Sequence, residues 1–278
     1  IEIQFDHKHY TTQANAVGKW AINLPPMQAG GPYELKIFSA HDSLILKDML
    51  FGDVFLASGQ SNMAFQLRAM NNGHAYIQHV AKYPQIRLFK NNNLIETTNS
   101  TWDVNTLQKI NDLEYFSGQW EVATTENVPY FSAISYVFAR ALHSSVDVPI
   151  GIIDLAVGGS NTESWIPRKA LEDDNLLSSY IHNWRKSDFV QDFCRFRGDK
   201  NLQLATVKNQ RHPYDPAYNY ESGIQKWVNT QLKGILWYQG ESNAHNVEHH
   251  AYVFTKLISS WRRSFNQELP FYFVQLSS

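Results

Sequence analysis

Three short polar segments hold the residues of this sequence that could carry out covalent catalysis. Each combines a glycine, a serine and an asparagine and directly follows an apolar run; they are GQSN at 59–62, GGSN at 158–161 and GESN at 240–243. A serine hydroxyl can attack an ester carbonyl, and glycine N–H groups and carboxamides can stabilise the resulting oxyanion. One such turn is more often a helix cap than a site. Three together favour a hydrolytic site, provided that the fold brings them to one place.

Ser61 is the candidate nucleophile. The preceding residues 54–58 read VFLAS, which predicts a buried strand, and Gly59 permits a tight turn at its end. Such a strand would present Ser61 at the edge of a sheet, although the same position also suits the N-cap of a helix. Met63 stands where the G-x-S-x-G motif of α/β-hydrolases has its second glycine, which argues against that fold.

Strands and helices alternate along the chain from residue 51 onward. Apolar runs at 54–58, 151–157, 234–239 and 271–276 predict buried strands. Such runs, when they alternate with helices, are typical of a parallel sheet that is covered on both faces. Because ligands bind beyond the carboxyl ends of parallel strands, the three polar segments would then meet at one edge of an α/β domain.

Two stretches between these runs show helical periodicity. Residues 131–143 place Phe131, Ile134, Phe138, Ala141 and Leu142 on one face. Residues 252–265 do the same with Val253, Leu257, Trp261 and Phe265. These faces are expected to cover the sheet.

The two ends of the chain differ in pattern, which predicts two units. Residues 1–50 consist of short β segments separated by turns and predict a small, incomplete β-rich accessory element. Residues 51–278 form the α/β domain. Within it, residues 168–219 lack a strand pattern and predict a partly helical insertion.

Composition excludes several classes of protein. The chain has 278 residues and a net charge of −2, which gives no reason to expect a nucleic-acid partner. No apolar run reaches the roughly 18 residues that cross a membrane. Cys194 is the one cysteine, so no intrachain disulfide can form. No histidine spacing fits a standard metal site.

The blocks SGQSNM, GGSNTESW and WYQGESN, in this order, resemble the sialate O-acetylesterase family of SGNH-type serine esterases. The similarity extends through AGGPYEL, LFGDVFL, FSAISYVFAR and LPFYFVQLS, so it covers most of the chain except the insertion. It implies a flavodoxin-like three-layer sheet with a β-rich companion. It also implies an esterase that acts on acetylated glycans without a cofactor. The start at Ile1 shows no signal peptide; we expect that one was removed from a periplasmic or secreted protein.

The resemblance also implies roles for individual residues. Ser61 matches the nucleophile, and its own N–H would be one oxyanion donor. Gly159 matches the glycine whose N–H is the second donor. Gln239 is the first choice for a third donor and Asn243 is the second choice.

Four further residues are predicted to contact substrate because they belong to these blocks. They are Gln60, Asn62, Glu241 and Trp165. Glu241 could instead orient its loop, and Trp165 could instead lie in the core, where we expect Trp237. The loop at 212–223, which is rich in proline and tyrosine, is expected to approach the site.

The general base is not identified in this sequence. The family takes it from an Asp-x-x-His block after the FVQLS strand, whereas the last histidine here is His250. We expect that this block is missing through truncation or lies on a separate segment. His74 and His245 are the alternatives within the chain. Two functions therefore stay open: an O-acetylesterase acting on sialic acid or on another glycan such as xylan, and a catalytically silent carbohydrate-binding relative.

Overall fold

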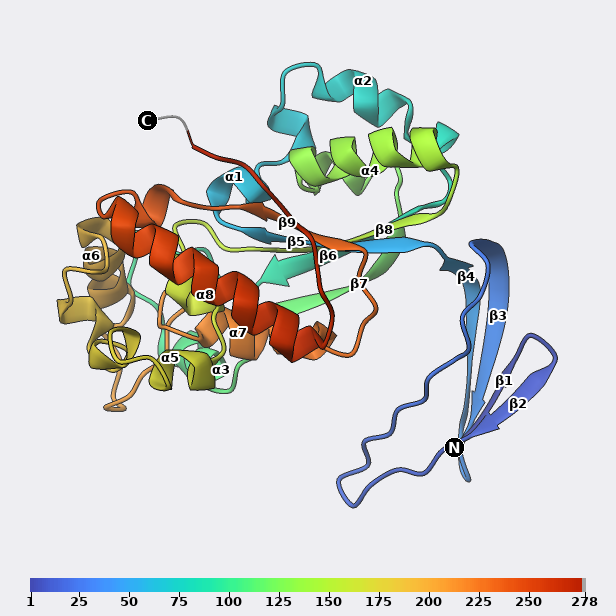
Figure 1. The fold of residues 1–278 in the computed structure, drawn as a ribbon, viewed down its shortest axis with the longest axis horizontal. Coiled ribbons are helices and arrows are strands. Elements are labelled where there is room, and N and C mark those ends of the chain that lie inside the picture. Colours follow the sequence, from blue (N-terminus) through green and yellow to red (C-terminus); the bar gives the residue numbers. More distant parts are fainter. Residues whose placement is uncertain (277–278) are drawn as a thin grey trace.

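Two separate β-sheets organise the computed structural model, which describes residues 1–276 (Figure 1). The smaller sheet is antiparallel, with spatial order β2-β1-β3-β4. Its strands are β1 (Glu2–Phe5), β2 (Lys8–Thr11), β3 (Gly30–Phe38) and β4 (Ser43–Phe51). Ile3, Phe5 and Leu35 form its own small core. The sheet therefore packs around residues that belong to the first part of the chain alone.

The larger sheet has six strands in the order β10-β9-β5-β8-β6-β7. The strands are β5 (Asp53–Gly59), β6 (Ile86–Asn93), β7 (Phe116–Val122), β8 (Ile150–Ala156), β9 (Gly234–Tyr238) and β10 (Phe271–Phe273). All neighbours are parallel except β6 and β7. The run β8-β5-β9-β10 has the 2-1-3-4 order of a flavodoxin-like sheet, with β6 and β7 added beside β8. The predicted fold class is confirmed.

Helices cover both faces of this sheet. One layer packs around Phe55 and Ala57 and contains α1 (Ser61–Ala64), α2 (Gly73–Gln78) and α4 (Ala133–Val146). The other packs around Leu56 and contains α3 (Val104–Asn111), α5 (Arg168–Glu172), α6 (Asp192–Asn201), α7 (Tyr218–Ser222) and α8 (Val247–Phe265). Successive strand residues point to opposite faces, which explains why two cores form.

The structure confirms the predicted face of α4 in part. Phe131 is buried just before the helix, and Phe138 and Leu142 pack partly buried against the same core, whereas Ile134 and Ala141 are exposed. The apolar residues of α4 that are fully buried are instead Ala133, Tyr136 and Ala139, because small alanines let the helix axis approach the sheet closely. The prediction for α8 is confirmed: the four apolar residues expected on its inner face are buried.

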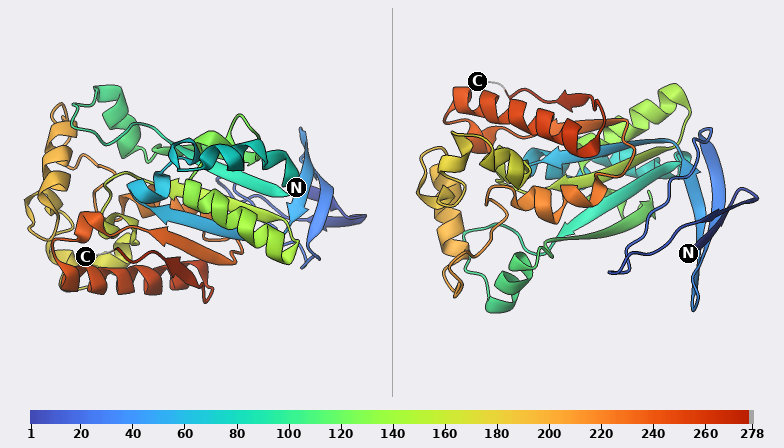
Figure 2. Two further views of the ribbon diagram at one scale, coloured as in Figure 1. Left: turned by 90° about the horizontal axis from the view of Figure 1, so that it is seen from above. Right: turned by 60° about the horizontal axis from the view of Figure 1, so that its bottom comes forward.

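The carboxyl ends of the parallel strands point toward the insertion, and the small sheet lies at the opposite end (Figures 1 and 2). The insertion contains α5, α6 and single 3-10 turns, and no strand is assigned between 168 and 219. It forms a wall beside the edge where the three polar turns lie. Within residues 1–276, no helix combines the length and the apolar character that a membrane span requires.

Candidate active site

The strand register places the three polar turns at one level of the sheet. Gly59 at the end of β5 is paired with Ala156 of β8 on one side and with Tyr238 of β9 on the other. Each polar turn begins within a few residues of one of these three paired residues. The turns therefore lie side by side, with the one that carries Ser61 in the middle.

Hydrogen bonds join the central turn to its two neighbours. The Gln60 N–H donates to Tyr238 O (3.0 Å), and the Gln60 side-chain oxygen accepts from the Ser242 N–H (3.2 Å). On the other side, Val157 N–H donates to Gly59 O at 3.1 Å. Asn62 donates from its side chain to the Glu241 carboxylate. These contacts fix the backbone on both sides of Ser61.

Ser61 is exposed at the first position of α1. The N-cap position belongs to Gln60, and no side-chain hydrogen bond caps the helix, so Ser61 is not used as a cap. Gly59 adopts φ +144°, and a Cβ at this position would lie 2.1 Å from Tyr238 O. A glycine is therefore required for β5 and β9 to remain paired up to the residue before the turn.

Two backbone N–H groups are available for an oxyanion. Among the backbone hydrogen bonds of residues 1–276, none uses the N–H of Ser61 or of Gly159. Gly159 adopts φ +73°, a left-handed conformation that favours glycine. Both groups lie at the same edge of the sheet, as the two predicted donors of an oxyanion hole would.

Gln239 and Asn243 lie beneath this edge and are buried. The Gln239 amide nitrogen donates to Ser160 O (3.2 Å) and to Asn243 Oδ1 (2.7 Å), so both of its N–H groups are used inside the protein. Asn243 Oδ1 also accepts from the Thr162 N–H at 3.0 Å. In this arrangement the two carboxamides connect the second and third turns, and the Gln239 amide presents no free N–H to a substrate.

The four residues predicted to contact substrate differ in how exposed they are. Asn62 is exposed and Glu241 is partly exposed, so both can reach a ligand. Gln60 is only 3% exposed. Trp165 is fully buried, and its indole N–H donates to Ser160 Oγ at 3.0 Å, so the ring lies in the core with no open face. Trp237 is also in the core, as expected.

Glu163 is a structural residue of the site that was not singled out from the sequence. Its carboxylate is fully buried in the 3-10 turn Thr162–Trp165 and accepts hydrogen bonds from Tyr180 Oη (2.9 Å) and Asn243 Nδ2 (3.0 Å). His249 Nε2 lies 3.2 Å away. Burial opposes ionisation, but hydrogen bonds from His249 and Asn243 hold the pKa of Glu163 below its usual value. The pairing of a buried glutamate with a histidine far along the chain could not be recognised from spacing.

Among the described residues, neither alternative base is hydrogen-bonded to Ser61. His74 is exposed on α2, and His245 is exposed with its Nε2 3.1 Å from Asp188 O. No histidine hydrogen bond found within residues 1–276 involves Ser61. Nor does the described part of the chain gather three or more His, Cys, Asp or Glu side chains as a metal site.

Comparison with known proteins identifies the family. The model of the carbohydrate esterase, sialic acid-specific acetylesterase family matches residues 51–191 and 203–278. The chain belongs to this family. It is similar to the sialate O-acetylesterases of Rattus norvegicus (29% identity, 98% of this chain, 52% of the relative) and Homo sapiens (28%, 93% and 47%). A solved carbohydrate acetylesterase from Xanthomonas citri matches with a TM-score of 0.70 and 30% identity, over 99% of this chain and 53% of that one.

The coverage percentages also show how much of each relative aligns with this chain. The chain spans about half the length of the curated relatives it matches. Within the chain, the family match omits residues 192–202, which contain all of α6. The three polar turns lie inside the matched ranges. The acetylesterase family model therefore includes the turns but not α6.

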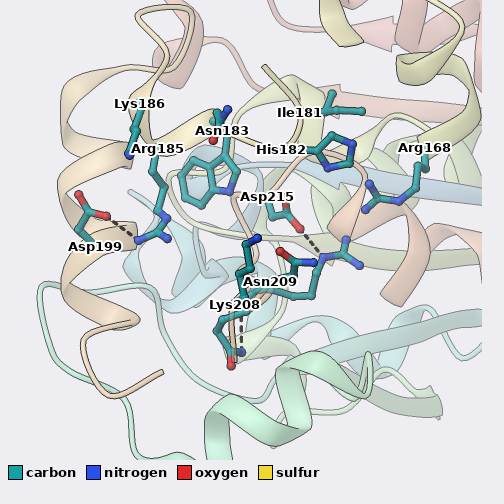
Figure 3. A pocket seen from close by; sticks show the side chains of 13 residues that line it. Arg168, Ile181, His182, Asn183, Arg185, Lys186, Asp199, Lys208, Asn209 and Asp215 are labelled. Carbon is teal, nitrogen blue, oxygen red and sulfur yellow. Dashed lines mark hydrogen bonds and ion pairs between the residues drawn. The ribbon is translucent and has the colours of Figure 1, made fainter. Parts of the chain in front are cut away.

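A basic pocket of about 390 Å³ lies in the insertion (Figure 3). Arg168, Arg185, Lys186, Lys208 and Arg211 contribute its positive charges. Its three arginines are all paired with carboxylates: Arg185 with Asp199, Arg211 with Asp215 and Glu221, and Arg168 with Glu221. These pairs leave the guanidinium groups of the pocket largely neutralised.

Proposed function

We propose that this protein removes acetyl groups from carbohydrates, with Ser61 as the nucleophile. The observation that carries the proposal is the placement of an exposed serine between two turns, with the unpaired N–H groups of Ser61 and Gly159 at the same sheet edge. Family membership supports the same chemistry.

In the proposed reaction, Ser61 Oγ attacks the acetyl carbonyl carbon and its proton passes to a base. The N–H groups of Ser61 and Gly159 donate to the developing oxyanion, and each such donor contributes about 10²–10³ in rate. The C–O bond to the sugar then breaks, and the sugar oxygen leaves with the proton. Water hydrolyses the acetyl-serine and releases acetate. We assign the base to the Asp-x-x-His block that the family carries after the FVQLS strand; the last histidine of these 278 residues, His250, precedes that strand.

The proposed substrate is an acetylated glycan. The names of the relatives support either a sialic acid or another acetylated carbohydrate, and an acetylxylan remains a candidate of the second kind. The same resemblance supports a periplasmic or secreted location. The rival proposal is a catalytically silent relative that binds carbohydrate. It is favoured by one observation: within residues 1–276, no histidine is hydrogen-bonded to Ser61.

The test uses the full-length gene product. We expect it to hydrolyse p-nitrophenyl acetate and to release acetate from acetylated sugars. Ser61→Ala should lower kcat by about 10⁴-fold or more, because the nucleophile is lost. Ser144→Ala, an exposed serine on α4, is the matched control and should retain full activity. If Ser61→Ala kept full activity, Ser61 would not be the nucleophile. Sugar binding without hydrolysis by the wild type would favour the silent relative.

A further inference from the structure

A second pocket, of about 510 Å³, lies on β6 and β7, the outer strands of the large sheet. The lining residues used below are Lys90, Asn92, Gln119, Glu121, Glu126, Asn127 and Tyr130. Ile86 and Leu88 of β6 belong to the core that α1 and α4 cover. Because alternate residues of a strand point to the same face, Lys90 and Asn92 point to that face too. The pocket therefore opens on the side of the sheet on which α1 begins with Ser61.

The pocket lies at the level of the turn that carries the nucleophile. Gly59 at the end of β5 is paired with Ala156 of β8. In the parallel register of β6 with β8, Asn93 donates from its side chain to Ala156 O at 3.2 Å, so the neighbouring Asn92 lies in the same row. Two steps of the strand spacing separate β5 from β6 by about 10 Å, which is about the span of two linked sugar residues. A glycan held at Ser61 can therefore reach the pocket.

Asn92 presents a carboxamide to this pocket. Its neighbours Asn91 and Asn93 donate from their side chains to carbonyl groups of β8 at 2.8 and 3.2 Å. Asn92 is exposed, and its side chain makes no hydrogen bond within residues 1–276. Asparagine is unfavourable in strands, so its presence here is explained better by a ligand than by the fold.

The charges of the pocket suit a neutral ligand rich in hydroxyl groups. The Glu121 carboxylate is oriented by hydrogen bonds from Gln119 (3.3 Å) and Asn127 (2.9 Å). Lys90 forms no ion pair among the described residues, and Glu126 contributes a second carboxylate. With one ammonium group and two carboxylates, the pocket disfavours an anion. The carboxylates accept from hydroxyl groups, and the ammonium and amide groups donate to them.

Tyr130 forms a wall of the pocket and is connected to the helix of the nucleophile. Its ring is 45% exposed, and Arg68 Cζ and Lys90 Nζ lie 4.6 and 5.7 Å from the ring centroid. Next to it in the chain, Phe131 O accepts from the Leu67 N–H at 2.9 Å, just after α1. The pocket wall and the segment that follows Ser61 are therefore held together.

We propose that this pocket binds a neutral sugar residue that is linked to the acetylated one, so that the protein prefers acetylated oligosaccharides to acetylated monosaccharides. The sugar hydroxyl groups donate to Glu121 and accept from Asn92 and Lys90. The inference rests on the proposed function, because it places the acetyl group at Ser61. Contacts remote from the reacting bond raise kcat/KM, and a few hydrogen bonds of this kind give about a 10- to 100-fold preference for the oligosaccharide.

The first test compares kcat/KM of the full-length gene product within two pairs of esters. The pairs are O-acetylated sialyllactose with O-acetylated sialic acid, and O-acetylated xylotetraose with O-acetylated xylose; the larger member of each pair adds neutral sugar residues. We expect about a 10- to 100-fold preference for the larger member in at least one pair. Asn92→Ala should lower this preference about 5-fold. Gln119→Trp, at an exposed position, fills the pocket and should bring the ratio close to one.

Hydrolysis of p-nitrophenyl acetate distinguishes a lost subsite from a damaged fold. Because this ester is too small to reach the pocket, Asn92→Ala and Gln119→Trp should hydrolyse it like the wild type. Asn105→Ala and Asn105→Trp, at an exposed position of α3, are the matched controls. They should change neither this activity nor the preference.

A binding measurement separates this inference from the proposed function. In the Ser61→Ala protein, sialyllactose and xylotetraose are titrated calorimetrically; at least one should bind, and Gln119→Trp should weaken that binding. Absence of a preference in both pairs, a preference that survives Gln119→Trp, or no binding of either oligosaccharide would overturn the role of the pocket. If the wild type hydrolysed no acetyl ester while Gln119→Trp still weakened binding, the esterase function would fall and the pocket would stand as a sugar site.

Discussion

At the scale of single residues, the sheet edge combines exposed side chains with backbone that is held by hydrogen bonds. Ser61 is exposed, yet the residues on either side of it are hydrogen-bonded to the third turn. Beneath the edge the side chains are buried and polar, and Asp154 on β8 is one of them. Burial raises the pKa of Asp154 to about 7, because little compensates for the loss of water around its carboxylate.

Asp154→Asn is expected to stabilise the protein at neutral and alkaline pH. The Asp154 carboxyl group has a higher pKa in the folded protein than in the unfolded chain. As the pH rises above the pKa of the unfolded chain, ionisation of Asp154 therefore favours the unfolded state. The gain in unfolding free energy should therefore grow between pH 4 and pH 7 and reach about 2–4 kcal/mol above that. Urea unfolding of both proteins at several pH values measures it. Asp173→Asn, an exposed carboxylate on the surface, is the control. A gain that did not change with pH would contradict the assigned cause.

At the scale of elements, a buried polar network connects segments that are far apart in the chain. Glu163 in the 3-10 turn after β8 accepts from Asn243 in the turn after β9, and it contacts His249 in the first turn of α8. Tyr180 of the insertion donates to the same carboxylate. One side chain thus holds two of the polar turns, a helix and the insertion together.

Glu163→Gln is expected to cost about 3–5 kcal/mol of unfolding free energy, because an amide cannot accept every hydrogen bond that the carboxylate accepts, and buried donors lose their partner. Chemical denaturation compared with the wild type gives this number. The exposed Glu172→Gln on α5 provides the matched comparison and should change stability by less than about 0.5 kcal/mol. A loss below about 1 kcal/mol for Glu163→Gln would show that the network is not needed for stability.

At the scale of the whole molecule, the two ends of the large sheet differ in what surrounds them. The small antiparallel sheet lies at the amino ends of the parallel strands, and the insertion lies at the carboxyl ends (Figure 2). Strand β10 is the outer strand of the described sheet, and its Tyr272 and Phe273 are 53% and 56% exposed. An exposed apolar edge is a site where further chain can pair.

The 278-residue chain expressed alone is expected to hydrolyse p-nitrophenyl acetate at close to the background rate. If the base belongs to the Asp-x-x-His block, as proposed, Ser61 in this chain lacks a proton acceptor, and such a site retains only ~10³–10⁴-fold catalysis over water. A chain extended by an Asp-x-x-His block after the FVQLS strand should be faster by about 10³-fold or more, with a rate that rises near the ordinary histidine pKa of ~6.5. Full activity of the short chain would refute this assignment of the base, and His74 and His245 would be the next residues to substitute.

Much of the architecture could be predicted from the sequence because it depends on local patterns. Buried apolar runs such as 151–157, separated by helical stretches, predicted the α/β sheet and the edge at which the polar turns meet. The inner face of α8 followed from its periodicity. The face of α4 followed only in part: Phe138 packs against the core as predicted, whereas Ile134 is exposed because Ala133 and Ala139 bring the helix close to the sheet.

The sequence by itself determined which residues could do chemistry: a serine after a predicted strand, glycines in the turns beside it, and family blocks in a fixed order. Only the tertiary structure decided how the remaining polar residues are used. Gln239 and Asn243 donate inside the protein, and Trp165 is buried. Arg197 reaches Gly159 from a helix almost 40 positions later in the chain. The reason is physical: a side chain's partners depend on which segments pack around it, and those segments are distant in sequence.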